Sequence, residues 1–200
     1  MRTAFLIDGF NFYYAIKSLN KRLRWFDYRR YCQHFINNND TVEKMVYFTA
    51  IADWQPETAA RHRVFIAACQ TNGIEVVFGK FKGKTWRCEK CGQNNQRHEE
   101  KATDVNIALT AYRLARQMET GKIILVTGDT DFVPVVKAIQ RDFSSINVGV
   151  IFPPQRVSKE LKAEANFYYH TGIEMLADFQ LPEQIIKSNG KKITRPSYWL

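Results

Sequence analysis

The chain has 200 residues, of which 45% are hydrophobic and 14% aromatic. This length and composition are typical of one globular domain with a full core, and they exclude a mainly disordered chain. The 29 Lys and Arg residues against 20 Asp and Glu give a formal net charge of +9. Such a charge favours a polyanionic partner, with nucleic acid the obvious candidate. A basic protein with no such partner would carry the same charge, so charge alone leaves both interpretations open.

The start of the chain predicts neither secretion nor membrane insertion. The apolar run after Met1 is short and soon meets Asp8, unlike a signal peptide. No stretch of the sequence approaches the roughly 20 apolar residues that a spanning helix requires. We therefore expect a cytoplasmic protein with no membrane partner.

Strands and helices are predicted to alternate along the chain. Short apolar runs predict five strands, at residues 3–7, 44–51, 74–78, 123–126 and 147–152. Helical spacing and capping residues predict helices at residues 10–20, 28–36, 56–73, 99–121, 134–139, 158–167 and 173–179, with Asp27 and Ser158 as N-caps. The helix from Glu99 is expected to bury Val105, Ala108, Leu109, Tyr112 and Ala115.

The remaining segments lack a sustained apolar period. Residues 80–100 are predicted to form an inserted basic loop, and residues 181–200 a basic C-terminal tail after one domain at 1–180. Strands that alternate with helices form βαβ units. The sequence therefore predicts an α/β fold with a five-stranded parallel sheet and helices on both faces.

Acidic residues follow the predicted strands. Asp8 ends the first strand, and Asp129 and Asp131 follow the fourth strand after Gly128. Asp104 lies near the start of a helix that follows a strand, which places it at the same edge of a parallel sheet. If the first and fourth strands are neighbours at the switch point, these four carboxylates converge.

Clustered carboxylates repel one another unless cations or protons neutralise them. Oxygen ligands select Mg²⁺ or Mn²⁺, and paired ions of this kind stabilise the attacking and leaving oxygens in phosphodiester cleavage. Each acid also has a purely structural interpretation. Asp8 and Asp104 could satisfy helix N-termini, Asp129 could form an Asx-turn, and Asp131 could cap a helix while Asp129 binds metal.

Two of the four cysteines form a Cys-x-x-Cys pair, Cys88 and Cys91. This spacing lets two thiolates approach one Zn²⁺, and His98 could be a third ligand; the alternative is a reduced hairpin tip. Cys32 and Cys69 fall on apolar helical faces and are predicted to be core thiols.

The same segment mixes aromatic and cationic side chains, which could stack on bases and bind phosphates. A solvated basic face is the alternative. The residues concerned are Phe81, Lys82, Lys84, Trp86, Arg87 and Lys90.

Four segments together resemble the successive motifs of NYN domains, which belong to the PIN-like nuclease superfamily, in the bacterial group described as LabA-like. The segments are residues 5–11 (FLIDGFN), 100–105 (EKATDV), 126–132 (VTGDTDF) and 158–161 (SKEL) with Phe167. They occur in the family's order, and the resemblance covers roughly residues 3–180.

The resemblance implies a Rossmann-like PIN fold and RNA cleavage that depends on Mg²⁺ or Mn²⁺. It implies that Asp8, Asp104, Asp129 and Asp131 carry the reaction. Asn11 and Lys101 match polar positions of the family, Asn11 to orient a metal-bound water or phosphate and Lys101 to pair with the acids or the phosphodiester. A homodimer is a further implication.

Three hypotheses follow. The first is a metal-dependent endoribonuclease that leaves a 5′-phosphate on its product. The second is a non-catalytic RNA-binding or regulatory module with the same fold. The third is a hydrolase of small phosphoesters, which the wide basic surface disfavours.

Overall fold

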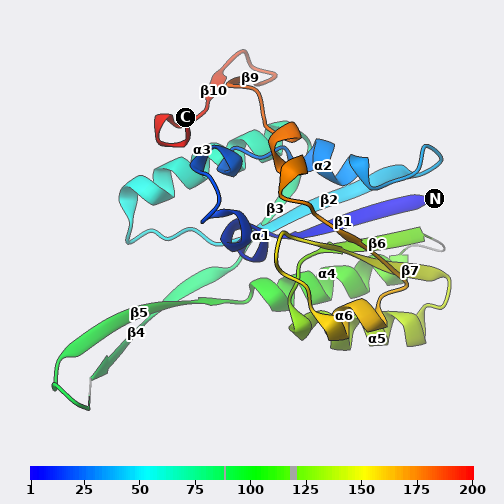
Figure 1. Ribbon diagram of the computed structural model, residues 1–200, viewed down its shortest axis with the longest axis horizontal. Coiled ribbons are helices and arrows are strands. Elements are labelled where there is room, and N and C mark those ends of the chain that lie inside the picture. Colours follow the sequence, from blue (N-terminus) through cyan, green and yellow to red (C-terminus); the bar gives the residue numbers. More distant parts are fainter. Residues whose placement is uncertain (88, 118–120) are drawn as a thin grey trace.

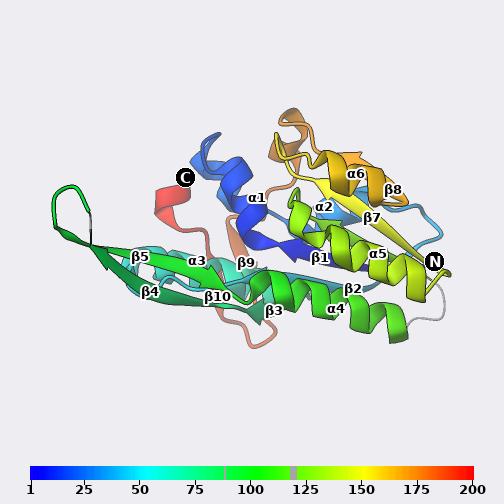
Figure 2. The same cartoon turned by 90° about the horizontal axis from the view of Figure 1, so that it is seen from below.

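A six-stranded parallel sheet forms the centre of the computed structural model, which describes residues 1–87, 89–117 and 121–200. The strand order is β3-β2-β1-β6-β7-β8 (Figures 1 and 2). The strands are β1 (Arg2–Asp8), β2 (Thr41–Thr49), β3 (Glu75–Phe78), β6 (Gly121–Val126), β7 (Ile146–Phe152) and β8 (Phe167–His170). The predicted α/β class and parallel sheet are confirmed, with six strands in place of five.

Helices cover both faces of this sheet (Figure 1). Side chains alternate along β1, so that Phe5 and Ile7 join one apolar cluster while Ala4 and Leu6 join the other. The first cluster includes residues of α1 (Gly9–Ile16), α2 (Tyr28–His34) and α3 (Pro56–Thr71). The second includes residues of α4 (Thr103–Gln117), α5 (Val133–Asp142) and α6 (Lys159–Glu164). The predicted core thiols Cys32 and Cys69 are buried in the first cluster.

The sixth strand, β8, corrects a prediction. The sequence pattern predicts a helix from Ser158 through Phe167, and Ser158 does cap α6 by accepting from Leu161 N at 3.0 Å. However, α6 ends at Glu164. Asn166 then fixes the chain beside β7, because its N–H donates to the Val148 carbonyl (2.9 Å) and its Oδ1 accepts from Val148 N (2.7 Å).

The predicted loop at residues 80–100 is a long antiparallel hairpin. β4 (Lys80–Arg87) pairs with β5 (Asn94–Lys101), and the hairpin projects from the body of the molecule (Figures 1 and 2). We call it the hairpin arm. Its strands are almost wholly polar and exposed, so they lack the apolar alternation that marks a half-buried strand.

Helix α4 begins later than predicted, at Thr103 instead of Glu99. Ala102 has a positive φ of 78° and separates β5 from the helix. The predicted inner face was wrong at Val105 and Leu109, which are 59% and 49% exposed. The buried stripe of α4 consists of Thr103, Ile107, Ala111, Leu114 and Ala115.

The C-terminal segment, predicted as a basic tail, packs against the rest of the chain. β9 (Gln184–Ile186) pairs with β10 (Lys192–Thr194), followed by a short 3-10 helix, η4 (Ser197–Trp199). The other short 3-10 helices of the described residues are η1 (Lys21–Arg24), η2 (Thr130–Phe132) and η3 (Glu174–Asp178). Four side chains of the segment are buried in the first apolar cluster: Leu181, Ile185, Ile193 and Trp199. In the described parts of the chain, no helix has the length and apolar character needed to cross a membrane.

Candidate active site at the carboxyl edge of the sheet

The switch in strand order places the ends of β1 and β6 side by side. These strands pair in parallel with Ile7 opposite Val126, so Asp8 lies beside Thr127. The Thr127 hydroxyl donates to Asp8 Oδ2 at 3.0 Å, and Thr127 Oγ1 accepts from Asp129 N at 3.2 Å. Thr127 thus connects Asp8 with Asp129, the acids that follow the first and fourth predicted strands, and these strands are neighbours as the convergence requires.

Asp8 is both a helix cap and a member of the acidic edge. Its Oδ1 accepts from Asn11 N at 2.9 Å, at the N-terminus of α1, and the residue is 4% exposed. Burial raises the pKa of Asp8 to about 6, against the two hydrogen bonds from Asn11 N and Thr127, which lower it. The charges of Asp104 and Asp129 raise the pKa further.

Asn11 fixes the turn that follows β6. Its side-chain Oδ1 accepts from Gly128 N at 3.0 Å. Glycine is required at 128 because a Cβ there would clash with the backbone carbonyl of Arg156. The turn carrying Asp129 is therefore held between α1 and the segment after β7.

A pocket of about 390 Å³ collects most of the predicted acids. Burial first, then the charges of Asp129, Glu100 and Asp131, raise the pKa of Asp104, so these carboxylates act on one another. The pocket is lined by Asp8, Phe10, Asn11, Tyr14, Phe81, Arg97, His98, Glu99, Glu100, Asp104, Asp129 and Arg156.

Two of the six predicted catalytic residues lie outside the lining of this pocket. Asp131 is exposed, and its N–H donates to Asp129 Oδ1 at 3.0 Å, which is the Asx-turn considered for Asp129. Lys101 forms an ion pair with Glu99, with 3.1 Å between Nζ and Oε2, and its side chain is half exposed. Each is near the edge without facing the pocket.

Sequence reasoning missed Thr127, Glu100, Arg97 and Arg156. Glu100 caps α4, because its Oε1 accepts from Thr103 N at 3.0 Å and also from the Thr103 hydroxyl. Glu100 precedes Thr103, which is the reverse of the capping-box order, so the sequence pattern does not indicate this cap. No local sequence pattern marks Arg156, because its position beside Gly128 arises only from the folded arrangement of two distant segments.

The carboxylates that line the acidic pocket fit a hard divalent cation in part. Among the described residues, no three acidic, histidine or cysteine side chains lie close enough to hold an ion as they stand. Mg²⁺, however, usually binds through one or two carboxylates and keeps waters or phosphate oxygens as its other ligands. Burial, and after it the charges of neighbouring carboxylates, raise the pKa of Asp8 and Asp104, and such a cation would relieve the repulsion between these carboxylates.

The predicted zinc ligands are not brought together within the described residues. Cys88 lies outside those residues, and Cys91 is an exposed free thiol in the turn of the hairpin arm. His98 pairs with Gly83 further along the arm and stacks on Trp54, with 3.7 Å between ring centroids. The structure therefore gives His98 an aromatic partner away from Cys91.

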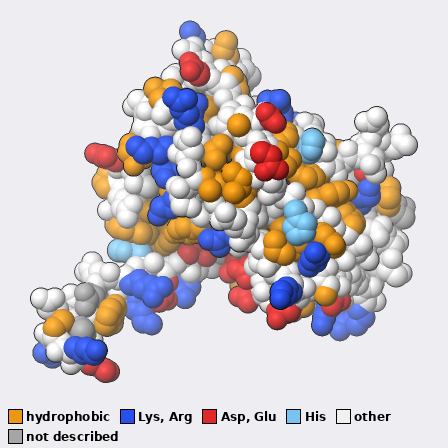
Figure 3. Space-filling view, viewed as in Figure 1, with side chains coloured by type: hydrophobic (Ala, Val, Ile, Leu, Met, Phe, Trp, Pro, Cys, Tyr) orange, Lys and Arg blue, Asp and Glu red, His pale blue; other side chains and the backbone are white. Residues whose placement is uncertain are grey.

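The predicted nucleic-acid contacts lie along the hairpin arm, where Figure 3 shows Lys and Arg side chains. Alternation along β4 places Lys82, Lys84 and Trp86 on one face, and Trp86 is 49% exposed. Arg87 Nε donates to the Gly92 carbonyl at 3.1 Å, and Lys90 lies in the turn. The base of the arm carries Phe81, which lines the acidic pocket.

A parallel α/β sheet with an acidic pocket where β1 meets β6 defines a PIN-like domain. The chain belongs to the NYN domain family, whose model matches residues 2–176. This family is one of PIN-like nucleases, as the sequence motifs indicate.

Two similar proteins extend the comparison. The 6-hydroxy-3-succinoylpyridine 3-monooxygenase HspA of Pseudomonas putida is 24% identical over 240 aligned positions, which cover the whole chain and 75% of that protein. The crystal structure of a protein of unknown function, VPA0982 from Vibrio parahaemolyticus, superposes with a TM-score of 0.59 at 24% identity. That match covers 90% of this chain and 96% of the Vibrio chain, and supports the fold alone.

Proposed function

We propose that this protein is an endoribonuclease that depends on Mg²⁺ or Mn²⁺ and acts in the acidic pocket. The observation that carries the proposal is the convergence of Asp8, Asp104 and Asp129 on one pocket beside a basic arm. Family membership supports nuclease chemistry, and the net charge of +9 supports a polyanionic substrate.

Asp8, Asp104 and Asp129 would hold the cation, one or two of them directly and the others through its bound waters, and the charge of Asp131 acts on Asp104. When bound, Mg²⁺ or Mn²⁺ would supply the positive charge that stabilises the oxygens of the scissile phosphate. Asn11 and Thr127 keep the two acidic turns in place through their hydrogen bonds.

Cations near the pocket would bind the substrate backbone. Arg97 and Arg156 line the pocket and would donate to phosphate oxygens of the bound strand. Lys101, whose ammonium pairs with Glu99, would exchange that partner for a phosphodiester. The hairpin arm carries Lys82, Lys84 and Trp86 on one face. This face would contact the RNA strand beyond the scissile phosphate.

The test is cleavage of a labelled mixed RNA pool by the full chain, with Mn²⁺, with Mg²⁺ and with a chelator. We expect cleavage only with metal, and loss of cleavage in Asp8→Asn and Asp129→Asn to the level of the chelator control. Asp178→Asn is a matched control, because Asp178 is an exposed aspartate of η3 outside the pocket lining. A parent that binds RNA but leaves it intact would favour the non-catalytic RNA-binding module.

A second candidate function comes from the Pseudomonas relative, named as a monooxygenase of a substituted hydroxypyridine. The observation that favours it is a cavity lined by aromatic residues next to the acidic pocket. Incubation of the parent with a hydroxypyridine, a reduced nicotinamide and oxygen, followed by mass spectrometry, would detect a hydroxylated product. Such a product, with intact RNA in the first assay, would replace the ribonuclease proposal.

A further inference from the structure

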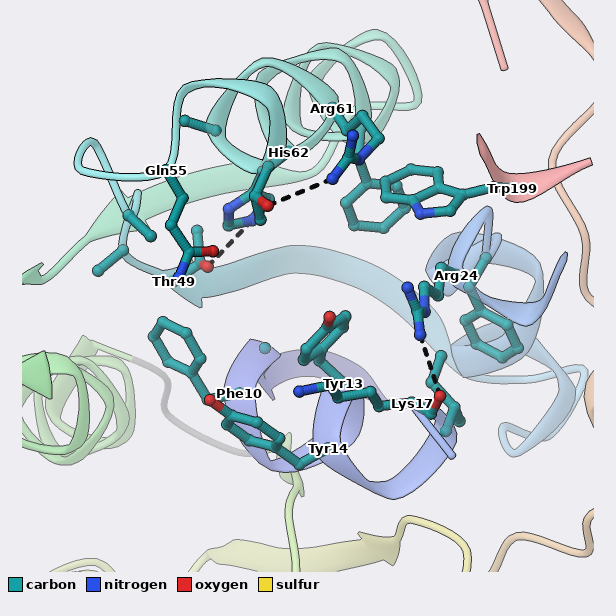
Figure 4. A pocket seen from close by; sticks show the side chains of 18 of the residues that line it. Phe10, Tyr13, Tyr14, Lys17, Arg24, Thr49, Gln55, Arg61, His62 and Trp199 are labelled. Carbon is teal, nitrogen blue, oxygen red and sulfur yellow. Dashed lines mark hydrogen bonds between the residues drawn. The ribbon is translucent and has the colours of Figure 1, made fainter. Parts of the chain in front are cut away.

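A second pocket, of about 460 Å³, adjoins the acidic pocket and shares four lining residues with it: Phe10, Tyr14, Phe81 and His98. Its other walls come from α1, residues 24–28, the end of β2, α3 with the loop before it, and residues 198 and 199. Figure 4 shows Phe10 and Tyr14 of α1 on one side and Gln55 and His62 on the other. A ligand in this pocket would therefore lie directly beside the acids.

The walls of this pocket present aromatic faces to a ligand. Trp54 is 39% exposed, stacks on His98 and forms a T-shaped contact with Phe81, with 4.7 Å between ring centroids. Tyr14 is 51% exposed at the boundary between the two pockets. Exposed aromatic faces that converge on a cavity provide a stacking surface for a flat ring.

The two pockets differ in the sign of their charge. The acidic pocket is lined by five carboxylates and two arginines, whereas no carboxylate among the described residues lines the second pocket. Its cations are Lys17, Arg24 and Arg61. The Lys17 ammonium lies 5.5 Å from the centroid of the Tyr14 ring, so a cation is placed near an aromatic face. This combination suits a flat ring that carries an anionic group.

Arg24 also has an unused donor. One of its terminal nitrogens donates to the Lys17 carbonyl at 3.0 Å, but its Nε is buried and has no hydrogen-bond partner among the described residues. A buried donor without a partner is unfavourable, and an anionic oxygen would satisfy it. The Thr49 hydroxyl and His62 Nε2, 3.2 Å apart, and the Gln55 amide add polar groups to the opposite wall.

We propose that this pocket is a nucleobase subsite, which holds one unpaired base of an RNA strand whose scissile phosphate lies over the acidic pocket. Trp54 and Tyr14 stack on the base, and Lys17 and Arg24 bind the adjoining phosphate. The inference rests on the proposed ribonuclease function and adds a substrate class to it. Only a single-stranded or unstacked nucleotide can present its base to such a pocket.

The experiment measures binding and cleavage of a single-stranded RNA hexamer by the full chain with Mn²⁺. Binding is measured in the Asp129→Asn background, which keeps the hexamer intact. We expect Trp54→Ala to weaken binding about tenfold, since one base stacked on an aromatic side chain contributes that much or more. Lys17→Gln should weaken binding as well. In hexamers with one abasic nucleotide, placed at each position in turn, the Trp54→Ala effect should disappear at one position.

The matched control is Tyr168→Ala with Lys162→Gln. These residues also form an aromatic and cationic pair, with the Lys162 ammonium 4.5 Å from the Tyr168 ring centroid, but they lie on β8 and α6. Their substitution should leave hexamer binding unchanged. Thermal unfolding of each variant verifies that it is folded.

The outcomes separate the subsite from the proposed function. A parent that cleaves RNA while the Trp54 and Lys17 variants bind and cleave equally well overturns the subsite and leaves the nuclease intact. A parent without cleavage, whose hexamer binding still depends on Trp54 and on one base, supports the subsite and rejects the nuclease. Binding of free pyridine-3-carboxylate that depends on Trp54, with no hexamer binding, overturns the subsite in favour of a small aromatic acid.

Discussion

At the scale of single residues, Asp8 combines two roles that are usually treated as alternatives. One of its carboxylate oxygens caps α1 by accepting from Asn11 N, and the other accepts from Thr127. The cap fixes the carboxylate at the end of β1, so that it reaches the pocket with almost no freedom to rotate away. A structural role for this aspartate therefore positions it for the proposed chemistry.

The pKa of Asp8 gives a prediction for the metal-free protein. The folded state keeps a proton on Asp8 up to a pH of about 6, whereas the unfolded chain releases it near 3.8. The folded state thus binds more protons at Asp8 between these values, so the contribution of Asp8 to stability falls as the pH rises from 4 to 6. A difference of about two units corresponds to at most about 3 kcal/mol of unfolding free energy.

We expect Asp8→Asn, which cannot titrate, to be more stable than the parent at pH 7 in a chelator, and the two to converge near pH 4. Urea unfolding between pH 4 and 8 measures this difference. The comparison between variants is needed because burial lowers the pKa of His62 to about 4, which makes stability rise with pH over the same range. Parallel curves for the two proteins would contradict the prediction.

Much of the acidic edge could be predicted from the sequence, and the reason is local. Asp8 and Asp129 follow apolar strands directly, so a strand pattern is enough to place them at one edge of a parallel sheet. Arg156 and Thr127 could not be assigned in this way, because their roles depend on contacts between distant segments. The same limit applies to the aromatic pocket, whose walls come from residues as distant as Phe10 and Trp199.

At the scale of elements, the hairpin arm is the largest departure from the predicted organisation. Its two strands contact each other more than they contact the sheet, and they have no buried face to impose an apolar pattern. The arm leaves the body at the wall of the acidic pocket, through Phe81 and His98. A strand of nucleic acid bound at the acids would therefore pass along it.

Substitution of three arm lysines tests this arrangement. We expect Lys82→Gln, Lys84→Gln and Lys90→Gln together to weaken RNA binding at low salt and to reduce the slope of log K against log salt by about 2, since each phosphate contact on a single strand contributes ~0.7. The matched control replaces three lysines of the C-terminal hairpin, Lys187, Lys191 and Lys192, by Gln. Fluorescence anisotropy at 50–200 mM salt measures both; equal slopes for the two triple variants would show that the arm has no special contact with RNA.

The elements that the sequence pattern misplaced share a physical cause. β8 and the hairpin arm are held by hydrogen bonds to partners that propensity does not reveal, such as the pairing of Asn166 with Val148. The start of α4 depends on a left-handed turn at Ala102, a conformation that the residue type does not favour. Long buried strands such as β1 and β6 were predictable because burial on both faces leaves a continuous apolar run.

At the scale of the whole molecule, the last 20 residues close one side of the fold. Leu181 N donates to the Trp25 carbonyl (3.0 Å), and Trp25 Nε1 donates to the Pro182 carbonyl (2.8 Å). Trp199 is 7% exposed and lies 6.3 Å, between ring centroids, from both Trp25 and Phe65. Residues 198 and 199 also line the aromatic pocket. The segment is thus part of both the core and the proposed nucleobase subsite. The homodimer that the resemblance implies stays a prediction.

This closure predicts a large loss of stability when Trp199 is truncated. We expect Trp199→Ala to lower the free energy of unfolding by about 3 kcal/mol, because it leaves a cavity against Trp25 and Phe65. Tyr198→Ala is the matched control: Tyr198 is 48% exposed and contacts Lys21 and Arg61 through its ring, so its loss should cost under about 1 kcal/mol. A chain that ends at Gln180 should unfold at a lower temperature than either variant, since it exposes Trp25 and lacks the buried side chains of Leu181 and Ile185 as well. Thermal and urea unfolding measure all three. If the shortened chain unfolded at the parent's midpoint, residues 181–200 would be a dispensable appendage, and the domain boundary at 180 that the sequence predicts would hold.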